Sequence, residues 1–154
     1  MRRKERECSD KAFLSGLLQK ADVMTIAFQS EEFPYVIPVN FVLVHNAVYF
    51  HCAREGRKLD CLKKSPKVGF SVHELLGIDQ EHATTFYKCL YGEGHAFLVQ
   101  DRGEKQAALA ALAEKYQSRC TLPVPEPLLE KTAVVRIDIV SMSGKRHLPP
   151  LRQN

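Results

Sequence analysis

The feature that most constrains this chain is the stretch 47–68, in which a strand pattern changes into a helix pattern through one glycine. Residues 47–53 are mostly apolar, and their side chains alternate between two faces as in a strand. Gly56 then accepts backbone angles that other residues avoid. A short helix is expected over 57–64, because Pro66 prevents it from continuing. The sequence therefore predicts a strand, a tight loop and a helix in immediate succession.

Positive charge gathers where this short helix begins. Arg54, Arg57 and Lys58 lie at a helix N-terminus, where the macrodipole is already positive and four backbone N–H groups lack partners. A phosphate group would interact favourably with the free N–H groups, the dipole and the cationic side chains together. Two interpretations stay open from the residues alone, a phosphate-binding turn and a solvated basic turn.

Composition and charge indicate one globular domain. The chain has 154 residues, 45% hydrophobic and 26% charged, with a net charge of +4 that is concentrated near its two ends. No apolar run approaches the roughly 20 residues that span a bilayer, and no apolar segment follows the charged N-terminus as in a signal peptide. Aromatic residues are not interleaved with the basic ones, which ranks nucleic-acid binding last. We expect a cytoplasmic protein without membrane or nucleic-acid partners.

The cysteines indicate reduced thiols rather than a disulfide framework or a metal site. Their number, five, is odd, and no pair has the C-x-x-C spacing of a zinc site. We expect no metal, and we expect several of the cysteines to pack as small hydrophobic residues.

Hydrophobic periodicity predicts a mainly β chain with three helices. The expected strands follow one another as in hairpins, and no repeated β-α-β units are predicted. This order favours a small antiparallel barrel with helices packed outside. The expected strands are 23–28, 35–45, 47–53, 67–73, 84–100 and 132–142. Asp10 is expected to cap the first helix, and the other two helices are expected to begin at Arg57 and Glu104. Residues 74–83 and 118–129 are expected to be connections.

Some positions predict local irregularities. Pro38 cannot donate to a strand ladder, so its strand is expected at a sheet edge or bulge. Asn40 is a polar residue in an apolar strand and needs a partner, either backbone or ligand. Gly92 and Gly94 indicate a bulge or a close backbone approach within one long strand. Asp101 is expected to cap the third helix.

Established catalytic motifs do not occur in the sequence. It contains no G-x-G-x-x-G after a strand, no Walker sequence, no H-E-x-x-H and no nucleophile elbow. His51 is the histidine of greatest interest, since it lies in mid-strand one short loop before the basic turn. A purely structural role is its alternative. Cys52 lies on the opposite face and is expected to pack.

Several blocks of sequence resemble the FMN-binding split-barrel proteins, the relatives of pyridoxamine 5′-phosphate oxidase, and in particular their nitroimidazole-resistance (Nim-like) group. The blocks are YVIPVNF at 35–41, YFHCA-x-EGRK at 49–58 with SPKV at 65–68, YKCLYGEGHA at 87–96 and the closing strand at 133–145. The likeness covers residues 1–145, expected to be one flavin-binding domain, with 146–154 as a C-terminal tail. Cys89 departs from the serine usual there.

The resemblance implies a six-stranded split antiparallel β-barrel with flanking α-helices, which forms a homodimer with FMN at the subunit interface; FAD is possible. It implies that the phosphate is bound by Arg57 and Lys58, and that the isoalloxazine lies along Pro38, Val39, Asn40 and Phe41. Beneath the ring or the ribityl chain would lie His51, Cys52 and Ala53. The flavin of the partner subunit would be contacted by Tyr87, Lys88 and Cys89.

The implied function is that of an FMN-dependent oxidoreductase, similar to flavin reductases and nitroreductases, with His51 as the catalytic residue near the reactive face. A reduced nicotinamide or another small redox molecule would be its substrate. The alternative is a non-enzymatic split-barrel protein that binds haem or a deazaflavin. Haem would make His51 or His95 a candidate axial ligand.

Overall fold

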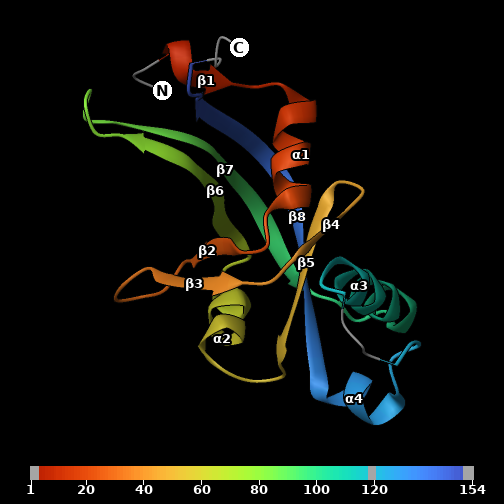
Figure 1. The fold of residues 1–154 in the computed structure, drawn as a ribbon. Coiled ribbons are helices and arrows are strands. Elements are labelled where there is room, and N and C mark those ends of the chain that lie inside the picture. The colour runs from red at the N-terminus through yellow and green to blue at the C-terminus, as the bar shows by residue number, and fades with distance from the viewer. Residues whose placement is uncertain (1–3, 118–120, 151–154) are drawn as a thin grey trace.

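A curled antiparallel sheet of eight strands forms the centre of the molecule (Figure 1), in a computed structural model that describes residues 4–117 and 121–150. The strand order is β3-β2-β6-β7-β8-β5-β4, with β1 paired to β8 off this path. Hence β3 and β4, which follow one another in the chain, lie at opposite edges of the curled sheet. The strands are β1 (Glu7–Cys8), β2 (Met24–Phe28), β3 (Tyr35–Val39), β4 (Val42–Val44), β5 (Ala47–Ala53), β6 (Lys67–Asp79), β7 (Thr84–Leu98) and β8 (Thr132–His147).

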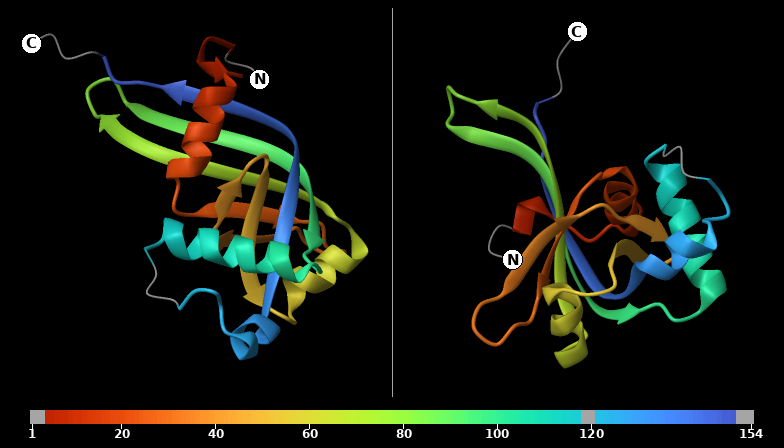
Figure 2. Two further views of the ribbon diagram at one scale, coloured as in Figure 1. Left: turned by 90° about the vertical axis from the view of Figure 1, so that its right-hand side faces the viewer. Right: turned by 90° about the horizontal axis from the view of Figure 1, so that it is seen from below.

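Helices flank the sheet on different sides (Figure 2). A 3₁₀ turn precedes β1, α1 and α2 each precede a central strand, and α3 and α4 connect β7 to β8. Their bounds are η1 (Lys4–Arg6), α1 (Lys11–Lys20), α2 (Arg57–Lys64), α3 (Arg102–Lys115) and α4 (Glu126–Lys131). The mainly β architecture, a split barrel with flanking helices, confirms the fold class expected from the sequence. The described residues form eight strands instead of the expected six, because β1 was not expected and the expected strand 35–45 divides into β3 and β4.

Strand β5 separates two hydrophobic cores. Val48 and Phe50 are fully buried in the main core, which also includes side chains of α1, α2, β2 and β6. Tyr49 faces the other way, into a smaller core with Ala108 and Leu112 of α3. The predicted alternation along β5 is thus confirmed, and both faces of this strand are covered until His51, which is exposed.

Both predicted aspartate caps are present. The Asp10 carboxylate accepts a hydrogen bond from the Ala12 N–H at 2.9 Å, and Asp101 accepts from the Glu104 N–H at 2.7 Å. The carboxylate of Glu104 does not bond back to the cap residue Asp101. It accepts instead from the Tyr49 hydroxyl at 2.8 Å and from Arg136 at 3.2 Å, and so fastens α3 to the sheet.

The predicted strand 35–45 is wrong as one unit, because it breaks at Asn40 and Phe41 into β3 and β4. The cause is a distant contact that a local pattern cannot show. The Phe41 N–H donates to the Tyr116 hydroxyl at 2.9 Å, and that hydroxyl lies 2.9 Å from the Phe41 carbonyl oxygen. These bonds replace ladder partners, so the chain leaves the edge of the sheet here and re-enters it at the opposite edge.

Two expected connections also contain regular structure. Residues 74–79 continue β6, which pairs with β7 in a long hairpin, so the predicted loop shrinks to the turn after Asp79. Both faces of this arm are largely exposed, which explains why it lacks an amphipathic pattern. In the Pro-rich connection, α4 begins at Glu126 with Pro125 as its cap residue.

The predicted irregularity near Gly94 is confirmed. The pairing of β7 with β8 shifts its register between Glu93 and Gly94. A Cβ atom at Gly94 would lie 2.6 Å from the carbonyl oxygen of Asp138 and 2.7 Å from a methyl carbon of Ile137. The two strands can therefore approach this closely only because residue 94 has no side chain.

We expect Gly94→Ala to lower the free energy of unfolding by about 1–3 kcal/mol, because the new methyl group would meet a backbone carbonyl that cannot turn aside. Gly69→Ala is the control, since a Cβ there meets nothing nearer than 3.9 Å. Urea unfolding of both variants measures the difference. Equal stability of the two variants would contradict the close approach of β7 and β8 at Gly94.

The Tyr116 hydroxyl holds the edge of the fold beside Asn40. It lies 2.8 Å from the carbonyl oxygen of Asp22 as well as bonding the backbone of Phe41. The neighbouring Lys115 ammonium lies 3.9 Å from the centre of the Phe41 ring and donates to the Ala21 carbonyl at 2.7 Å. Burial at this position lowers the pKa of Lys115.

Tyr116→Phe should destabilise the protein by about 1–3 kcal/mol, because the N–H of the buried Phe41 would lose its acceptor. Tyr87→Phe is the matched control, since the Tyr87 hydroxyl makes no hydrogen bond with the residues that the structure describes. Thermal and urea unfolding report the effect. A Tyr116→Phe variant as stable as Tyr87→Phe would contradict the assigned role.

Candidate functional site

A groove of about 390 Å³ lies between the edge strand β3, the end of β5 and the first turn of α2. Two segments that are separated in sequence meet here: residues 35–40, and the continuous stretch in which β5 leads through the Gly56 loop into α2. Its lining residues are Tyr35, Ile37, Pro38, Val39, Asn40, His51, Cys52 and Lys58. Six of these were predicted from the sequence as cofactor contacts, so the fold brings most of the first three predicted groups together.

The β3 side of the groove offers backbone groups. As predicted from Pro38, β3 is an edge strand: within residues 4–117 and 121–150 its only strand partner is β2. The backbone on its other edge is therefore available to a ligand. The side-chain amide nitrogen of Asn40 donates to the Asp22 carbonyl at 3.3 Å, which gives this residue the backbone partner that the sequence argument required.

The α2 side of the groove is a helix N-terminus without a cap. Gly56 has φ 120°, a conformation that favours glycine, and it provides no side chain for the N–H groups of the first turn. Its carbonyl oxygen accepts from Leu59 at 2.9 Å and from Asp60 at 3.2 Å. Among the residues described, the backbone N–H groups of Arg57 and Lys58 have no acceptor. They are available to an anion.

The three cations of the basic turn have different surroundings. The Arg57 guanidinium lies 4.8 Å from the centre of the Tyr35 ring, with Nη2 3.4 Å from the Ser30 hydroxyl. Lys58 is half-buried and lines the groove, and its ammonium has no partner in the described part of the chain. Arg54 turns away and donates to the Glu130 carbonyl at 3.0 Å. Two positive charges therefore remain beside the groove.

The Cys52 side chain is half-buried in the groove wall and packs against the main core. Burial raises the pKa of its thiol, and the nearby Lys58 ammonium only partly opposes this effect. The thiol is therefore protonated at neutral pH and is a poor nucleophile. This agrees with the packing role expected from the sequence.

Two predicted residues beside the groove have little or no side-chain surface in it. The Phe41 ring is fully buried, and its backbone N–H and carbonyl both bond to Tyr116. Ala53 is the last residue of β5 and is exposed where the strand turns into the Gly56 loop. Their direct contact with a cofactor stays a prediction.

The predicted group on β7 lies far from this groove within one chain. Tyr87, Lys88 and Cys89 belong to the part of β7 near the hairpin turn, at the other end of the molecule from α2 (Figure 1). Lys88 shares its face with the buried Leu90, and its ammonium lies 3.4 Å from the Glu74 carboxylate. Tyr87 and Cys89 point to the opposite face. A contact with the cofactor of a partner subunit stays a prediction for all three.

A second cavity, of about 400 Å³, shares Asn40 and His51 with the groove. Its other walls come from α3 and the region of α4: Leu109, Leu112, Ala113, Tyr116, Val124, Leu128 and Thr132. The sequence reasoning missed this cavity. The amphipathic pattern of α3 gave the only signal, and that pattern also fits simple core packing.

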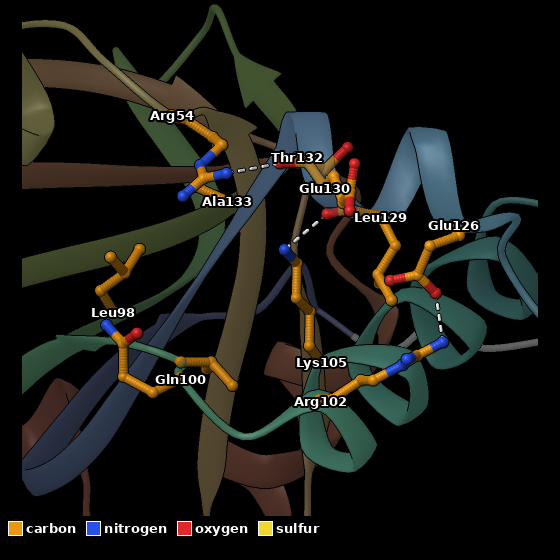
Figure 3. Close-up of a pocket in the computed structure, with 11 residues that line it drawn as sticks. Arg54, Leu98, Gln100, Arg102, Lys105, Glu126, Leu129, Glu130, Thr132 and Ala133 are labelled. Carbon is orange, nitrogen blue, oxygen red and sulfur yellow. Dashed lines mark hydrogen bonds and ion pairs between the residues drawn. The ribbon is translucent and has the colours of Figure 1, made fainter.

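The cationic side chains that line a pocket of about 350 Å³ beside α4 hold this helix in place (Figure 3). Arg54 and Lys105 donate to the carbonyl oxygens of Glu130 and Leu129, at 3.0 and 2.6 Å, in the last turn of α4. Arg102 forms an ion pair with Glu126. Cations at carbonyl groups of a helix C-terminus are stabilising. Because each cation already has a partner, this pocket has no free charge for a ligand.

His95 is separated from His51. It lines a cavity of about 560 Å³ on the face of the sheet that carries Tyr91 and Val140. The residues described contain no cluster of three or more potential metal ligands. None of the helices in the described part is long and apolar enough to cross a bilayer.

Comparison with solved structures shows the same fold in several proteins. A candidate 5-nitroimidazole antibiotic resistance protein from Bacteroides thetaiotaomicron is 23% identical, with a TM-score of 0.79 over 90% of this chain and 85% of that one. A flavocytochrome from Azotobacter vinelandii is 20% identical, with a TM-score of 0.83 over 100% of this chain and 75% of that one. An FAD- and haem-binding protein from Mycobacterium smegmatis is 17% identical, with a TM-score of 0.79 over 94% and 75%.

Sequence comparison gives the family. No curated protein matches the chain in sequence. The family profile described as pyridoxamine 5′-phosphate oxidase matches residues 10–146, which include every strand from β2 to β7 and nearly all of β8. The chain therefore belongs to the pyridoxamine 5′-phosphate oxidase family, as its four sequence blocks indicated.

Proposed function

We propose that this protein is an FMN-dependent oxidoreductase that binds its flavin in the groove between β3, β5 and α2. The observation that carries the proposal is the pairing of an open strand edge with an uncapped, cationic helix start across one groove. A planar ring with hydrogen-bonding edges fits the open edge of β3, and a phosphate fits the uncapped, cationic start of α2. A flavin mononucleotide has both parts in one molecule.

The phosphate belongs at the first turn of α2. The N–H groups of Arg57 and Lys58 have no acceptor among the described residues, and the Lys58 ammonium is free. Arg57 is held by Ser30 and Tyr35 so that its charge stays near this turn. Three structural neighbours are described as binding FAD or as flavin proteins, so FAD is the second candidate cofactor for the groove.

The flavin would supply hydride and electron transfer, which no side chain in the groove can provide. The protein would orient the ring along the free edge of β3 and keep the phosphate fixed on α2. His51 would hold a proton on a ring nitrogen beside the reacting atoms. Among the described residues His51 has no hydrogen-bond partner, so its imidazole is available for this role.

A homodimer would complete this site. The face of the sheet that carries Tyr87 and Cys89 also exposes Tyr91 and Val140, which are 49% and 64% accessible. Exposed apolar side chains gathered on one face are typical of a protein interface. A second copy seated on this face would bring Tyr87 and Cys89 of one chain towards the groove of the other.

The haem alternative rests on His51, which is exposed at the edge of two cavities, and on the neighbours described as a flavocytochrome and as an FAD- and haem-binding protein. The visible spectrum and the mass of the molecule that co-purifies distinguish the two. Flavin gives a yellow protein and haem gives a Soret band. A colourless protein that does not bind added FMN would refute the proposed function.

Arg57→Ala combined with Lys58→Ala should weaken FMN binding by several kcal/mol, because each charge-assisted phosphate contact contributes about 1.5–3 kcal/mol. Lys63→Ala with Lys64→Ala is the charge-matched control at the other end of α2. Titration of the apoprotein with FMN, followed by flavin fluorescence, gives the affinities. If the two double variants bind FMN equally well, the phosphate is not held at the first turn.

His51→Ala should leave the fold and the FMN affinity intact and slow turnover by roughly 10²-fold, the lower end of the contribution of a positioned proton donor. His82→Ala, in the turn between β6 and β7, is the control. Stopped-flow measurement of flavin reduction and reoxidation reports the change. Parental kinetics in His51→Ala would show that the imidazole only supports the strand.

A further inference from the structure

The cavity shared by β5, α3 and α4 differs in chemistry from the groove beside it. Apolar side chains form most of its walls: Leu109, Leu112, Ala113, Val124 and Leu128. Lys58 lines the groove, whereas none of the described residues that line this cavity is an Asp, Glu, Lys or Arg. A charged group packed against these apolar side chains would lose its hydration without meeting a carboxylate, ammonium or guanidinium of the described residues, which is unfavourable.

The polar groups in the cavity wall are mostly occupied. The Tyr116 hydroxyl bonds to the backbone of Asp22 and Phe41, and the Thr132 hydroxyl donates to the Leu128 carbonyl at 2.8 Å. The Asn40 amide nitrogen donates to the Asp22 carbonyl. Of the polar side chains that line this cavity, His51 alone makes no hydrogen bond within the described residues.

His51 and Asn40 form the boundary between the cavity and the groove. A ligand in the cavity therefore lies directly against the place where the flavin ring is proposed. The two spaces separate two kinds of ligand. The groove, with the Lys58 ammonium, suits the proposed anionic nucleotide, and the described lining of the cavity suits a molecule without charge.

We propose that this cavity is the binding site for the substrate that exchanges electrons with the flavin, and that this substrate is a neutral, largely apolar ring compound. A volume of about 400 Å³ admits about a dozen non-hydrogen atoms, if each takes roughly the 30 Å³ of a water molecule. One hydrogen-bond acceptor on the ring would meet His51, and the remaining surface would pack on the leucines of α3 and α4. This inference rests on the proposed function for the redox role, but the binding site itself is formed by protein residues alone.

The inference predicts which substrates are rejected. A carboxylate or phosphate on the ring would have to be buried among leucines, so anionic analogues of the same size should bind poorly. A nucleotide would exceed the cavity in size as well as in charge. The neutral partner of the reaction is thereby distinguished from any phosphorylated electron donor, which would have to approach the flavin from another side.

A matched pair of probes and a matched pair of variants test this. The probes are 4-nitrotoluene, which is neutral, and 4-nitrobenzoate, which has nearly the same shape and one negative charge. Ala113→Phe fills the cavity from α3, and Ala107→Phe adds the same ring on the exposed side of the same helix. Equilibrium dialysis measures probe binding to the full chain as purified and after removal of any flavin, and the flavin content of each variant is measured in parallel.

We expect 4-nitrotoluene to bind the parent and Ala107→Phe at least about tenfold more tightly than 4-nitrobenzoate, and to lose at least about tenfold in affinity in Ala113→Phe. Equal binding of the two probes, or equal binding of 4-nitrotoluene to the two variants, would overturn the inference. Flavin binding is a separate result. A protein without flavin that still shows this pattern would retain the cavity assignment and lose the proposed redox function.

Discussion

The antiparallel pairing of β5 with β8 is the interaction on which the site depends. Phe50 lies opposite Val135 and His51 opposite Val134, and this register sets the face to which every side chain of β5 points. Because side chains alternate, a slip by one residue would send Phe50 out of the main core and reverse His51 and Cys52. The two cores that clasp β5 oppose such a slip, since Phe50 and Tyr49 are buried on opposite faces. The exposed position of His51 and the packing position of Cys52 are therefore separated by hydrophobic burial rather than by local polar contacts.

Electrostatics then distinguish one end of α2 from the other. Its first turn has no capping side chain and holds the cations Arg57 and Lys58, whereas Lys63 and Lys64 in its last turn are compensated by Asp60 and Glu31. The arrangement at the first turn is unfavourable for an isolated helix and becomes favourable when an anion is bound. Arg54 shows that charge alone does not define the site, because its guanidinium is used to hold α4. The difference between these cations lies in whether the fold already gives them a partner.

Local sequence patterns predicted what depends on local physics. The bounds of α2, the caps at Asp10 and Asp101, the alternation of β5 and the irregular pairing near Gly94 all follow from neighbouring residues. The break between β3 and β4 could not be predicted, since it needs the Tyr116 hydroxyl from 75 positions further along the chain. For the same reason the destination of Arg54 and the second cavity were not foreseen. The long β6–β7 hairpin was missed because both faces of its arm are exposed, so no hydrophobic period marks it.

The position of His51 unites the two spaces of the site. Burial covers β5 on both faces up to Phe50, and the strand ends three residues after it, so His51 is the first side chain free of both cores. An imidazole at this point touches the cationic groove on one side and the uncharged cavity on the other. In the proposed complex, a proton held there would lie between the flavin in the groove and the neutral ring in the cavity. The fold thus places the His51 imidazole, which has no hydrogen-bond partner among the described residues, at the boundary between the groove and the cavity. Hydrophobic packing of the preceding residues of β5 fixes its position and leaves its ring nitrogens free.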